Sequence, residues 1–428
     1  MPTGTSLSSV YPLASRLNEL GRLEVGGCDT IELAREFGTP AYVIAEDDLR
    51  SRAQSFLAAA RESSHPDLVI VFASKAFPCT AVLALFAREG LWCDVASAGE
   101  LHLALRAGFA PERIVLHGNA KSEAELRMAL RHRVGHIALD NFDEIGLLER
   151  LIADGELGDR PDGQPVLLRV APDVRGATHE KISTGQADSK FGFSMAAAPE
   201  GIARARAIAG LTVRGLHAHI GSQLLELEPF TRAAAELARL GDFEVWDLGG
   251  GLGVRYTEDQ PAPPAIADYV ETLVSAGTGW PGAPQRLLIE PGRALCANAG
   301  VTLYSVQSIK QNVSRWVAVD GGMSDNLRPM LYGAVYEAEV ADRFGDGDEC
   351  VLTGKHCESG DVIVARARLR EPAVGDVIVT PGTGAYGHAM ANNYNGVPRP
   401  PVIFCREGEA RVVVRRESLD DLLSRDVP

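Results

Sequence analysis

The chain has 428 residues and a formal net charge of −15 at pH 7, with 46% hydrophobic and 23% charged residues. This composition is typical of a globular protein with a large core, and its acidic balance argues against a nucleic-acid partner. No apolar run is long enough to cross a bilayer, residues 1–21 lack the features of a secretory signal, and the seven scattered cysteines favour reduced thiols, so we expect a cytoplasmic protein.

Short apolar runs alternate with longer stretches of helical character from residue 67 onward. Eight of these runs are candidate strands: 67–74, 92–97, 113–118, 136–140, 165–171, 213–221, 243–250 and 286–292. Apolar strands that alternate with helices predict a parallel sheet covered on its outer face. Eight such units in about 225 residues predict a TIM (β/α)8 barrel.

The pattern changes after about residue 300, where short apolar runs are separated by Gly, Asp and Pro. This pattern predicts a C-terminal antiparallel β domain, to which we add the N-terminal segment that precedes the barrel. We therefore expect a barrel domain over residues 46–297, and a β domain formed by residues 1–45 and 298–428.

Catalytic residues of TIM barrels gather where the strands end at the C-terminal face. Lys75 follows the first apolar run, where partial desolvation would favour the neutral amine that forms an imine. A lysine at a strand end is more commonly a solvated cap, so this position alone does not decide its role. Polar side chains follow most of the other runs as well: Asp94, His117, Asn119, His219, Ser222, Glu290 and Arg293.

Two motifs leave alternatives open. Gly249 to Gly251 can form a phosphate cup, or a dinucleotide fingerprint, although the segment after them is a poor helix start. His217 and His219 lie two apart on a predicted strand and hence on one face. They can bind a metal, pack in the core or stack on a flat cofactor. No other group with clear metal-ligand spacing joins them, so we predict no metal site.

The sequence EPGR places a carboxylate and a guanidinium on one tight turn. Glu290 can keep a pyridinium nitrogen protonated, and Arg293 can bind phosphate or carboxylate, unless the two form an internal salt bridge. Gly-rich segments in the C-terminal half also carry side chains suited to ligand recognition, namely Arg328, Tyr332, Cys357, Glu358 and Tyr386.

The motifs FASKAF, HIGSQ, GGGLG, EPGR, CESGD and GAYGHAMANNYN occur in this order. Together they resemble the group IV decarboxylases that depend on pyridoxal 5'-phosphate (PLP). The resemblance implies a PLP-binding TIM barrel with a β domain, in a homodimer whose active sites are shared between subunits. It implies decarboxylation of meso-2,6-diaminopimelate to L-lysine. The alternative is a related decarboxylase for ornithine, a carboxylated polyamine precursor or a carrier-bound amino acid.

The resemblance also implies roles for single residues. Lys75 would hold PLP as a Schiff base, His219 would stack on its ring, Glu290 would pair with its nitrogen, and Cys357 would donate a proton as the fourth catalytic residue. The cofactor-binding set is Lys75, Asp94, His219, Ser222, Gly249, Gly250, Gly251, Glu290, Gly292, Arg293 and Tyr386. The substrate-binding set is Arg293, Arg328, Tyr332, Glu358 and Tyr386, with Cys357 and Glu358 reaching across from the partner subunit.

Two positions depart from the family pattern. Ala98 stands where family members often have Gly, and His388 stands where they have Tyr; neither belongs to the PLP set. Three other readings are weaker. An alanine-racemase-like enzyme would place Arg against the ring nitrogen, a diamine-forming decarboxylase does not explain Arg328 and Tyr332, and a PLP carrier would lack the β domain.

Overall fold

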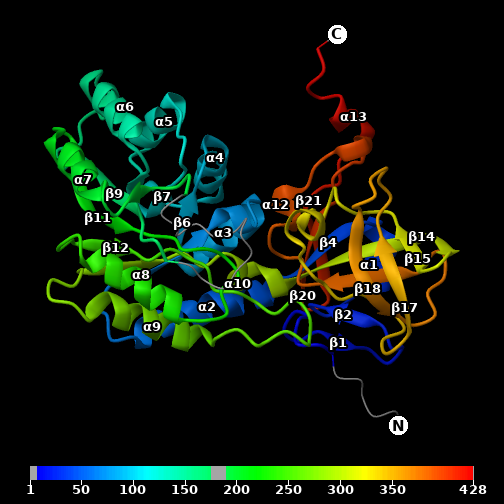
Figure 1. Ribbon diagram of the computed structural model, residues 1–428. Coiled ribbons are helices and arrows are strands. Elements are labelled where there is room, and N and C mark those ends of the chain that lie inside the picture. Colours follow the sequence, from blue (N-terminus) through cyan, green and yellow to red (C-terminus); the bar gives the residue numbers. More distant parts are fainter. Residues whose placement is uncertain (1–6, 175–188, 428) are drawn as a thin grey trace. The chain divides into compact units, whose positions relative to one another are not determined.

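The structure is a computed structural model that describes residues 7–174 and 189–427. The chain divides into two compact units (Figure 1). The first, here called the barrel unit, consists of Arg52–Gly253 and Pro263–Ala294. The second, here called the β unit, consists of Met1–Ser51, Val254–Ala262 and Leu295–Pro428.

In the described part of the barrel unit, eight parallel strands run in the order β9-β11-β12-β13-β5-β6-β7-β8, and β8 pairs back with β9 to close the barrel. Their bounds are β5 (Leu68–Ala73), β6 (Trp92–Val95), β7 (Ile114–Leu116), β8 (His136–Leu139), β9 (Gln164–Ala171), β11 (Leu211–His217), β12 (Val245–Asp247) and β13 (Arg286–Ile289). The two-residue strand β10 (Phe193–Ser194) pairs with β9. The predicted TIM barrel is confirmed. Several strands end earlier than the apolar runs suggested.

Apolar residues fill the barrel interior as one layer, which is the reason for the near-continuous hydrophobic runs. The buried members of this layer are Val71, Val115, Leu167, Val245 and Leu288, one from each of five strands. The polar residues considered below lie beyond this layer, toward the C-terminal ends of the strands.

Helices cover the outside of the barrel strands (Figure 1). Several begin at a side-chain cap. Ser122, for example, forms a capping box with Glu125, a device that contributes about 1 kcal/mol. The helices are α2 (Glu46–Glu62), which starts in the β unit, α3 (Thr80–Glu89), α4 (Ala98–Ala107), α5 (Glu123–His132), α6 (Phe142–Ala153), α7 (Ala198–Ala207), α8 (Glu228–Ala238), α9 (Ile266–Thr278) and α10 (Arg293–Cys296).

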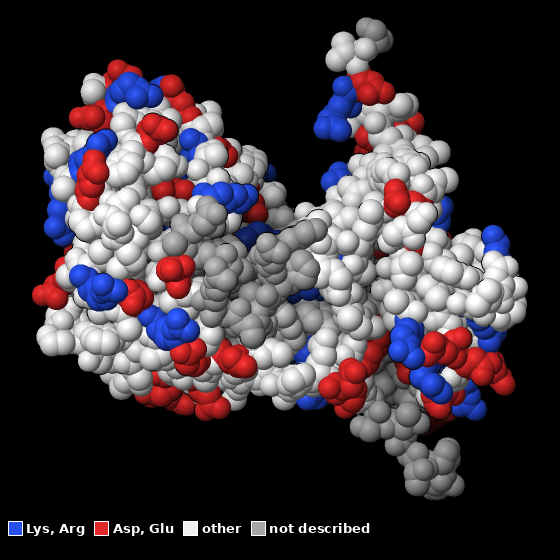
Figure 2. All heavy atoms as spheres, in the orientation of Figure 1, with Lys and Arg blue, Asp and Glu red and all other residues white. Residues whose placement is uncertain are grey.

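The outer faces of these helices carry charges of both signs, as Figure 2 shows for the visible side of the molecule. Glu200 pairs with Arg204 on α7, and Glu228 pairs with Arg232 on α8, one helical turn apart in each case. Such exposed pairs contribute little stability, about 0.3–0.5 kcal/mol each. They mark the solvent side of each helix, opposite the apolar side that packs on the strands.

The β unit contains a mixed sheet in the order β18-β17-β15-β14-β4-β20-β21, with β19 on β14 and β16 on β19. Its strands are β4 (Ala41–Ala45), β14 (Gly300–Gln311), β15 (Arg315–Val319), β16 (Glu339–Val340), β17 (Asp348–Thr353), β18 (Val362–Leu369), β19 (Val377–Pro381), β20 (Val402–Arg406) and β21 (Glu409–Val414). The N-terminal segment joins this sheet through β4, as expected. Most neighbouring strands pair antiparallel, as expected, but the sheet is mixed, because β4 pairs parallel with β20 and β15 pairs parallel with β17.

The remaining elements of the β unit are short. They are the three-stranded sheet β1 (Arg16–Leu17), β2 (Leu23–Val25) and β3 (Cys28–Asp29), and the helices α1 (Thr30–Phe37), α11 (Arg328–Tyr332), α12 (Gly387–Met390) and α13 (Leu419–Leu422). Among the helices of the described residues, none has the length and apolar character needed to cross a membrane.

Candidate active site

Lys75 lies just beyond the end of β5, in the 3-10 turn η1 (Ser74–Ala76). Its Nζ donates a hydrogen bond to Oδ2 of Asp94 on β6 at 2.7 Å. The Asp94 side chain is only 2% exposed, whereas that of Lys75 is 43% exposed. Lys75 is therefore less desolvated than the sequence suggested. It presents an accessible amine that a buried carboxylate holds in place.

His219 lies in the segment that follows β11, because this strand ends at His217. The prediction that both histidines share one strand face is therefore wrong. Nδ1 of His219 accepts a hydrogen bond from the backbone N–H of Gly250 at 3.1 Å, which leaves Nε2 to carry the proton. Burial, and then the charge of Lys75, lower the pKa of His219 well below its ordinary value. His219 is thus a neutral ring in a fixed orientation.

The glycines after β12 are required by close backbone contacts. A Cβ atom on Gly249 would lie 2.5 Å from the Ala218 carbonyl oxygen, and one on Gly250 would lie 2.1 Å from that of Glu290. Gly251 has a φ of +130°, which favours glycine, and its Cβ would also meet a backbone oxygen at 2.5 Å. No helix begins here, since α9 starts only at Ile266. The dinucleotide fingerprint is excluded, and a turn that brings backbone close to a ligand remains.

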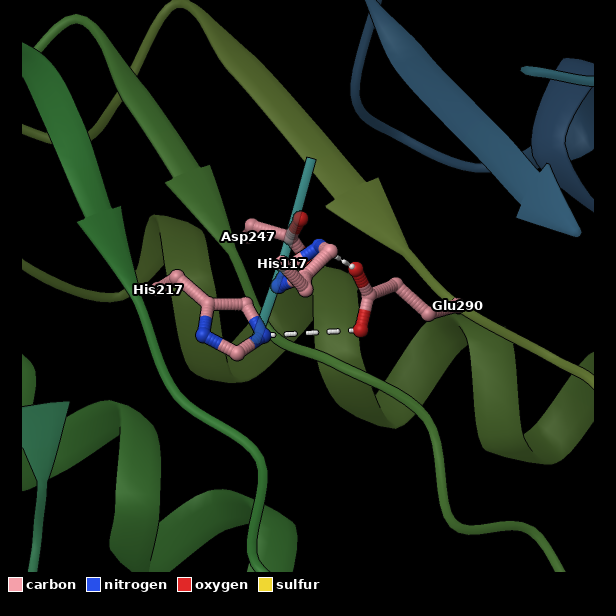
Figure 3. A group of neighbouring side chains, drawn as sticks. All are labelled: His117, His217, Asp247 and Glu290. Carbon is pink, nitrogen blue, oxygen red and sulfur yellow. Dashed lines mark hydrogen bonds and ion pairs between the residues drawn. The ribbon is translucent and has the colours of Figure 1, made fainter. Parts of the chain in front are cut away.

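Glu290 follows β13 and is 4% exposed. Its Oε1 lies 2.7 Å from Nε2 of His117, and its Oε2 lies 3.4 Å from Nε2 of His217, as Figure 3 shows. Burial alone would raise the pKa of Glu290, but the two histidines hold it well below its ordinary value. Burial also lowers the pKa of His217 to about 3, so this ring is neutral near pH 7.

Asp247, the last residue of β12, is fully buried beside Glu290, His117 and His217. Burial, and then the charge of Glu290, raise the pKa of Asp247 well above its ordinary value. The nearest donor atoms of the four side chains all lie within 4.8 Å of one another, and such ligand types also bind metals. His217 belongs to this group but His219 does not, and the absence of a metal site stays a prediction.

Arg293 begins α10, two residues beyond Pro291. It is 6% exposed and its Nη2 donates to Oγ of Ser222 at 2.9 Å. Gly292 packs against the start of the lysine turn, where a Cβ would lie 3.0 Å from that of Ala73. Residues from the turns after β11, β13 and β5 thus meet on one side of the barrel end.

Sequence reasoning missed Arg169, which lies on β9 and is 8% exposed. Its guanidinium lies over the ring of Phe191 at 4.4 Å, and its Nε is 4.0 Å from Oδ1 of Asp140. An arginine inside the run VLLRVA was the available signal, because a barrel strand seldom carries a charge unless a polar site lies beside it. Asp247, at the end of an apolar run and before three glycines, gave a similar signal.

The β unit holds the predicted substrate residues other than Arg293, which lies in the barrel unit. Arg328 begins α11 and is 5% exposed. Its guanidinium carbon lies 4.5 Å from the centre of the Tyr256 ring and 5.5 Å from that of the Tyr336 ring, and its Nη1 donates a hydrogen bond to the Tyr336 hydroxyl. Tyr332 ends the same helix and is half-buried. Tyr386 is half-buried with a φ of +65°, which is strained for a non-glycine residue and common at functional sites.

Cys357 and Glu358 are exposed at the tip of a loop. The loop is fixed from behind by Asp361, which is 3% exposed and whose carboxylate accepts from the backbone N–H groups of Met323 and His356 at 2.7 and 2.9 Å. A rigid loop that points two reactive side chains outward is suited to reaching another surface.

The two departures from the family pattern have simple surroundings. Ala98 begins α4, and its backbone N–H donates to Oε1 of Glu125 at 3.1 Å. His388 lies edge-on to Tyr42, and burial, followed by the charge of Arg399, lowers its pKa to about 4.

Comparison with known proteins defines the class first. Residues 47–297 match the family model "Pyridoxal-dependent decarboxylase, pyridoxal binding domain". The chain is 45% identical to the diaminopimelate decarboxylase of Bacillus subtilis (97% of each chain) and 41% identical to that of Mycobacterium tuberculosis (98% of each). A crystal structure of the M. jannaschii diaminopimelate decarboxylase with L-lysine matches with a TM-score of 0.90 and 31% identity, over 97% of this chain and 98% of that one. The chain therefore belongs to the diaminopimelate decarboxylase family of pyridoxal-dependent decarboxylases.

The barrel residues fit PLP by their chemistry. PLP needs an amine for its aldehyde, an acidic partner for its ring nitrogen and a cradle for its phosphate. Lys75 supplies an accessible amine, and Glu290 supplies a buried carboxylate whose Oε1 makes no hydrogen bond of good geometry within the described residues. The turn at Gly249 to Gly251 supplies backbone with no side chains in the way, and Arg293 supplies a positive charge.

Proposed function

We propose that this protein decarboxylates meso-2,6-diaminopimelate to L-lysine and CO2 with PLP as cofactor. The observation that carries the proposal is the full-length likeness to diaminopimelate decarboxylases, which spans both the barrel unit and the β unit. The proposed domains are a PLP-binding TIM barrel of residues 46–297 and a β domain of residues 1–45 and 298–428. Bound PLP supplies an electron sink for the electron pair left behind when the α-carboxylate departs as CO2.

The residues that hold PLP come from the barrel ends. Lys75 binds it covalently and Asp94 orients that amine; His219 stacks on its ring and Glu290 pairs with the ring nitrogen. The neutral state of His219 suits this role, since a flat uncharged ring can pack closely on an aromatic cofactor. The phosphate is held by Ser222, Gly249, Gly250, Gly251, Gly292 and Arg293, and Tyr386 also contacts the cofactor.

The substrate carries two carboxylates and two amino groups, so it needs cationic and anionic partners. Arg328 and Tyr332, helped by Arg293 and Tyr386, bind the carboxylates, and Glu358 binds the distal amino group. The aromatic walls around Arg328 hold its guanidinium in one plane for a bidentate contact.

Cys357 is the acid that completes the reaction. Its thiol gives a proton to the α-carbon after CO2 has left, and the thiolate regains a proton from solvent. The exposure of Cys357 and Glu358 supports a homodimer in which this loop enters the partner's active site. The catalytic set is then Lys75, His219 and Glu290 of one subunit with the Cys357 loop of the other.

The reaction class is tested with purified, PLP-loaded protein and the variant Lys75→Ala, with Lys310→Ala as a control at an exposed lysine on β14. The wild type and the control should show the absorbance of a lysine-bound cofactor and release CO2 from an amino acid. Lys75→Ala should lose both. Unchanged absorbance in Lys75→Ala would refute the assignment of this lysine.

A further inference from the structure

Each of the two carboxylate oxygens of Glu290 lies close to an imidazole nitrogen. Nε2 of His117 lies 2.7 Å from Oε1, and Nε2 of His217 forms a 3.4 Å hydrogen bond with Oε2 (Figure 3). The two rings lie 4.6 Å apart at a tilt of 60°, and all three side chains are at least 94% buried. This is a high density of ionisable groups for a barrel interior, where each costs desolvation energy.

The group forms a polar layer directly above the apolar one. His117 and Glu290 each lie two residues after a member of that apolar layer, Val115 and Leu288. His117 lies one residue past the end of β7 and Glu290 one residue past the end of β13, so both lie closer to the C-terminal end of the barrel than that layer does. The layer lies at the level of the ligand-binding end, and packing does not explain why it is polar.

Asp247 is the second carboxyl group of the layer, and burial, followed by the charge of Glu290, raises its pKa. Its Oδ1 accepts from the N–H of Gly249 at 3.0 Å, which ties the layer to the glycine turn. Other titratable groups that interact electrostatically with Glu290 are Arg169 on β9, Tyr269 on α9 and His219 after β11. Arg169 adds positive charge, and buried Tyr269 is neutral because burial raises its pKa.

We infer that His117 and His217 are positioning residues. They orient the Glu290 carboxylate toward the ring nitrogen of PLP and stabilise its negative charge. The inference rests on the proposed function in taking PLP as the ligand of the barrel. A carboxylate offers about four lone-pair sites, so two imidazole contacts leave room for a third donor. The histidines thereby set how firmly the ring nitrogen keeps its proton.

Replacing His117 with Phe keeps an aromatic ring but removes its nitrogen, so the buried Glu290 loses a group that favours its charged form. Its pull on the ring-nitrogen proton then weakens. His117→Gln restores a polar group near the position of Nε2 and should recover most of the effect. A purely structural role of His117 would not make the Gln and Phe variants differ in the protonation of the PLP ring nitrogen.

The test uses PLP labelled with 15N at the ring nitrogen, bound to the full-length protein and followed by solid-state NMR across pH. We expect His117→Phe to lower the pH midpoint of ring-nitrogen deprotonation by a unit or more relative to wild type, which is a tenfold change in proton affinity. The matched control is His136→Phe. His136 is a buried barrel histidine on β8 that stacks on Trp92, and it should leave the midpoint unchanged.

His217→Phe provides a second test if His117→Phe does not fold, and it should shift the midpoint in the same direction, because its Nε2 forms a hydrogen bond with Oε2 of Glu290. Normal PLP uptake with a wild-type midpoint in the folded variants would overturn this inference alone. Failure of the wild type to take up PLP would overturn the proposed function and this inference with it. One equivalent of zinc retained by the PLP-loaded wild type would also overturn it, because the histidines would then be metal ligands.

Discussion

The backbone N–H of Gly250 donates a hydrogen bond to Nδ1 of His219 at 3.1 Å. One residue therefore connects three parts of the site. Its N–H orients the imidazole, its missing side chain lets the turn contact the backbone of Glu290, and its neighbours form the turn assigned to the cofactor phosphate. A substitution at this position should disturb cofactor binding before it disturbs the fold.

Gly250→Ala should weaken PLP binding at least tenfold, since its Cβ would come within 2.1 Å of the Glu290 carbonyl oxygen and the turn must shift. The PLP dissociation constant, measured by fluorescence titration, checks this. Gly146→Ala is the matched control, because Gly146 lies within helix α6 and a Cβ there would meet nothing within 4 Å. The control should bind PLP as the wild type does. Equal affinity in both variants would refute the role of the turn.

Arg328→Lys should raise KM for the substrate on the order of 100-fold, since a bond to a charged group contributes about 1.5–3 kcal/mol and Lys cannot bind bidentately. PLP binding should not change. Steady-state kinetics check this, with Arg366→Lys as control, because the Arg366 side chain is 80% exposed on β18. If kcat fell while KM stayed constant, Arg328 would not serve substrate binding.

Asp361→Ala should lower kcat at least tenfold while leaving PLP absorbance intact. The variant removes the carboxylate that accepts from Met323 and His356, so the loop with Cys357 loses its anchor. Asp346→Ala is the control, since Asp346 is exposed and pairs with exposed Arg368. An Asp361→Ala enzyme with full activity would contradict the proposal that this loop takes part in catalysis.

The stability of the protein should depend on pH through His136. Burial, and then nearby arginine charges, lower its pKa from 6.5 to about 4 in the folded state. Above pH 6.5 this histidine does not lower the free energy of unfolding. As the pH falls from 6.5 toward 4, the free energy of unfolding decreases, because the unfolded chain binds a proton that the folded chain excludes.

Between about pH 7.5 and about pH 5, the free energy of unfolding of the wild type should therefore fall by about 2 kcal/mol more than that of His136→Phe. This difference corresponds to about 1.4 kcal/mol for each pH unit below 6.5. Urea denaturation of both proteins at the two pH values measures this difference. Parallel losses in the two proteins would show that His136 is protonated in the folded state.

Much of the barrel could be predicted from the sequence because each strand is a local apolar run, and a polar residue that follows such a run lies at the C-terminal end of the barrel. Lys75 and Glu290 were found in this way. The cluster around Glu290 could not be found so, because His117 is 173 positions away in the chain and meets it only when the barrel closes. The spacing of His217 and His219 was misleading because β11 ends between them.

The β unit was less predictable for a related reason. Alternating short runs indicate strands, but they do not reveal which strands pair. The parallel pairing of β4 with β20 joins segments from opposite ends of the chain, and that of β15 with β17 needs a crossover. The aromatic walls around Arg328 likewise come from residue 256 and residue 336, which the motif around Arg328 does not include.

The central claim is the substrate, and one measurement tests it most directly. PLP-loaded protein is given meso-2,6-diaminopimelate, ornithine, arginine or lysine in separate reactions, and both CO2 and the amine product are quantified. The account predicts L-lysine and CO2 in a 1:1 ratio from meso-2,6-diaminopimelate, with kcat/KM at least 100-fold above the other three, about the 3 kcal/mol expected when a charged substrate group lacks its partner. Faster CO2 release from ornithine or lysine would contradict it.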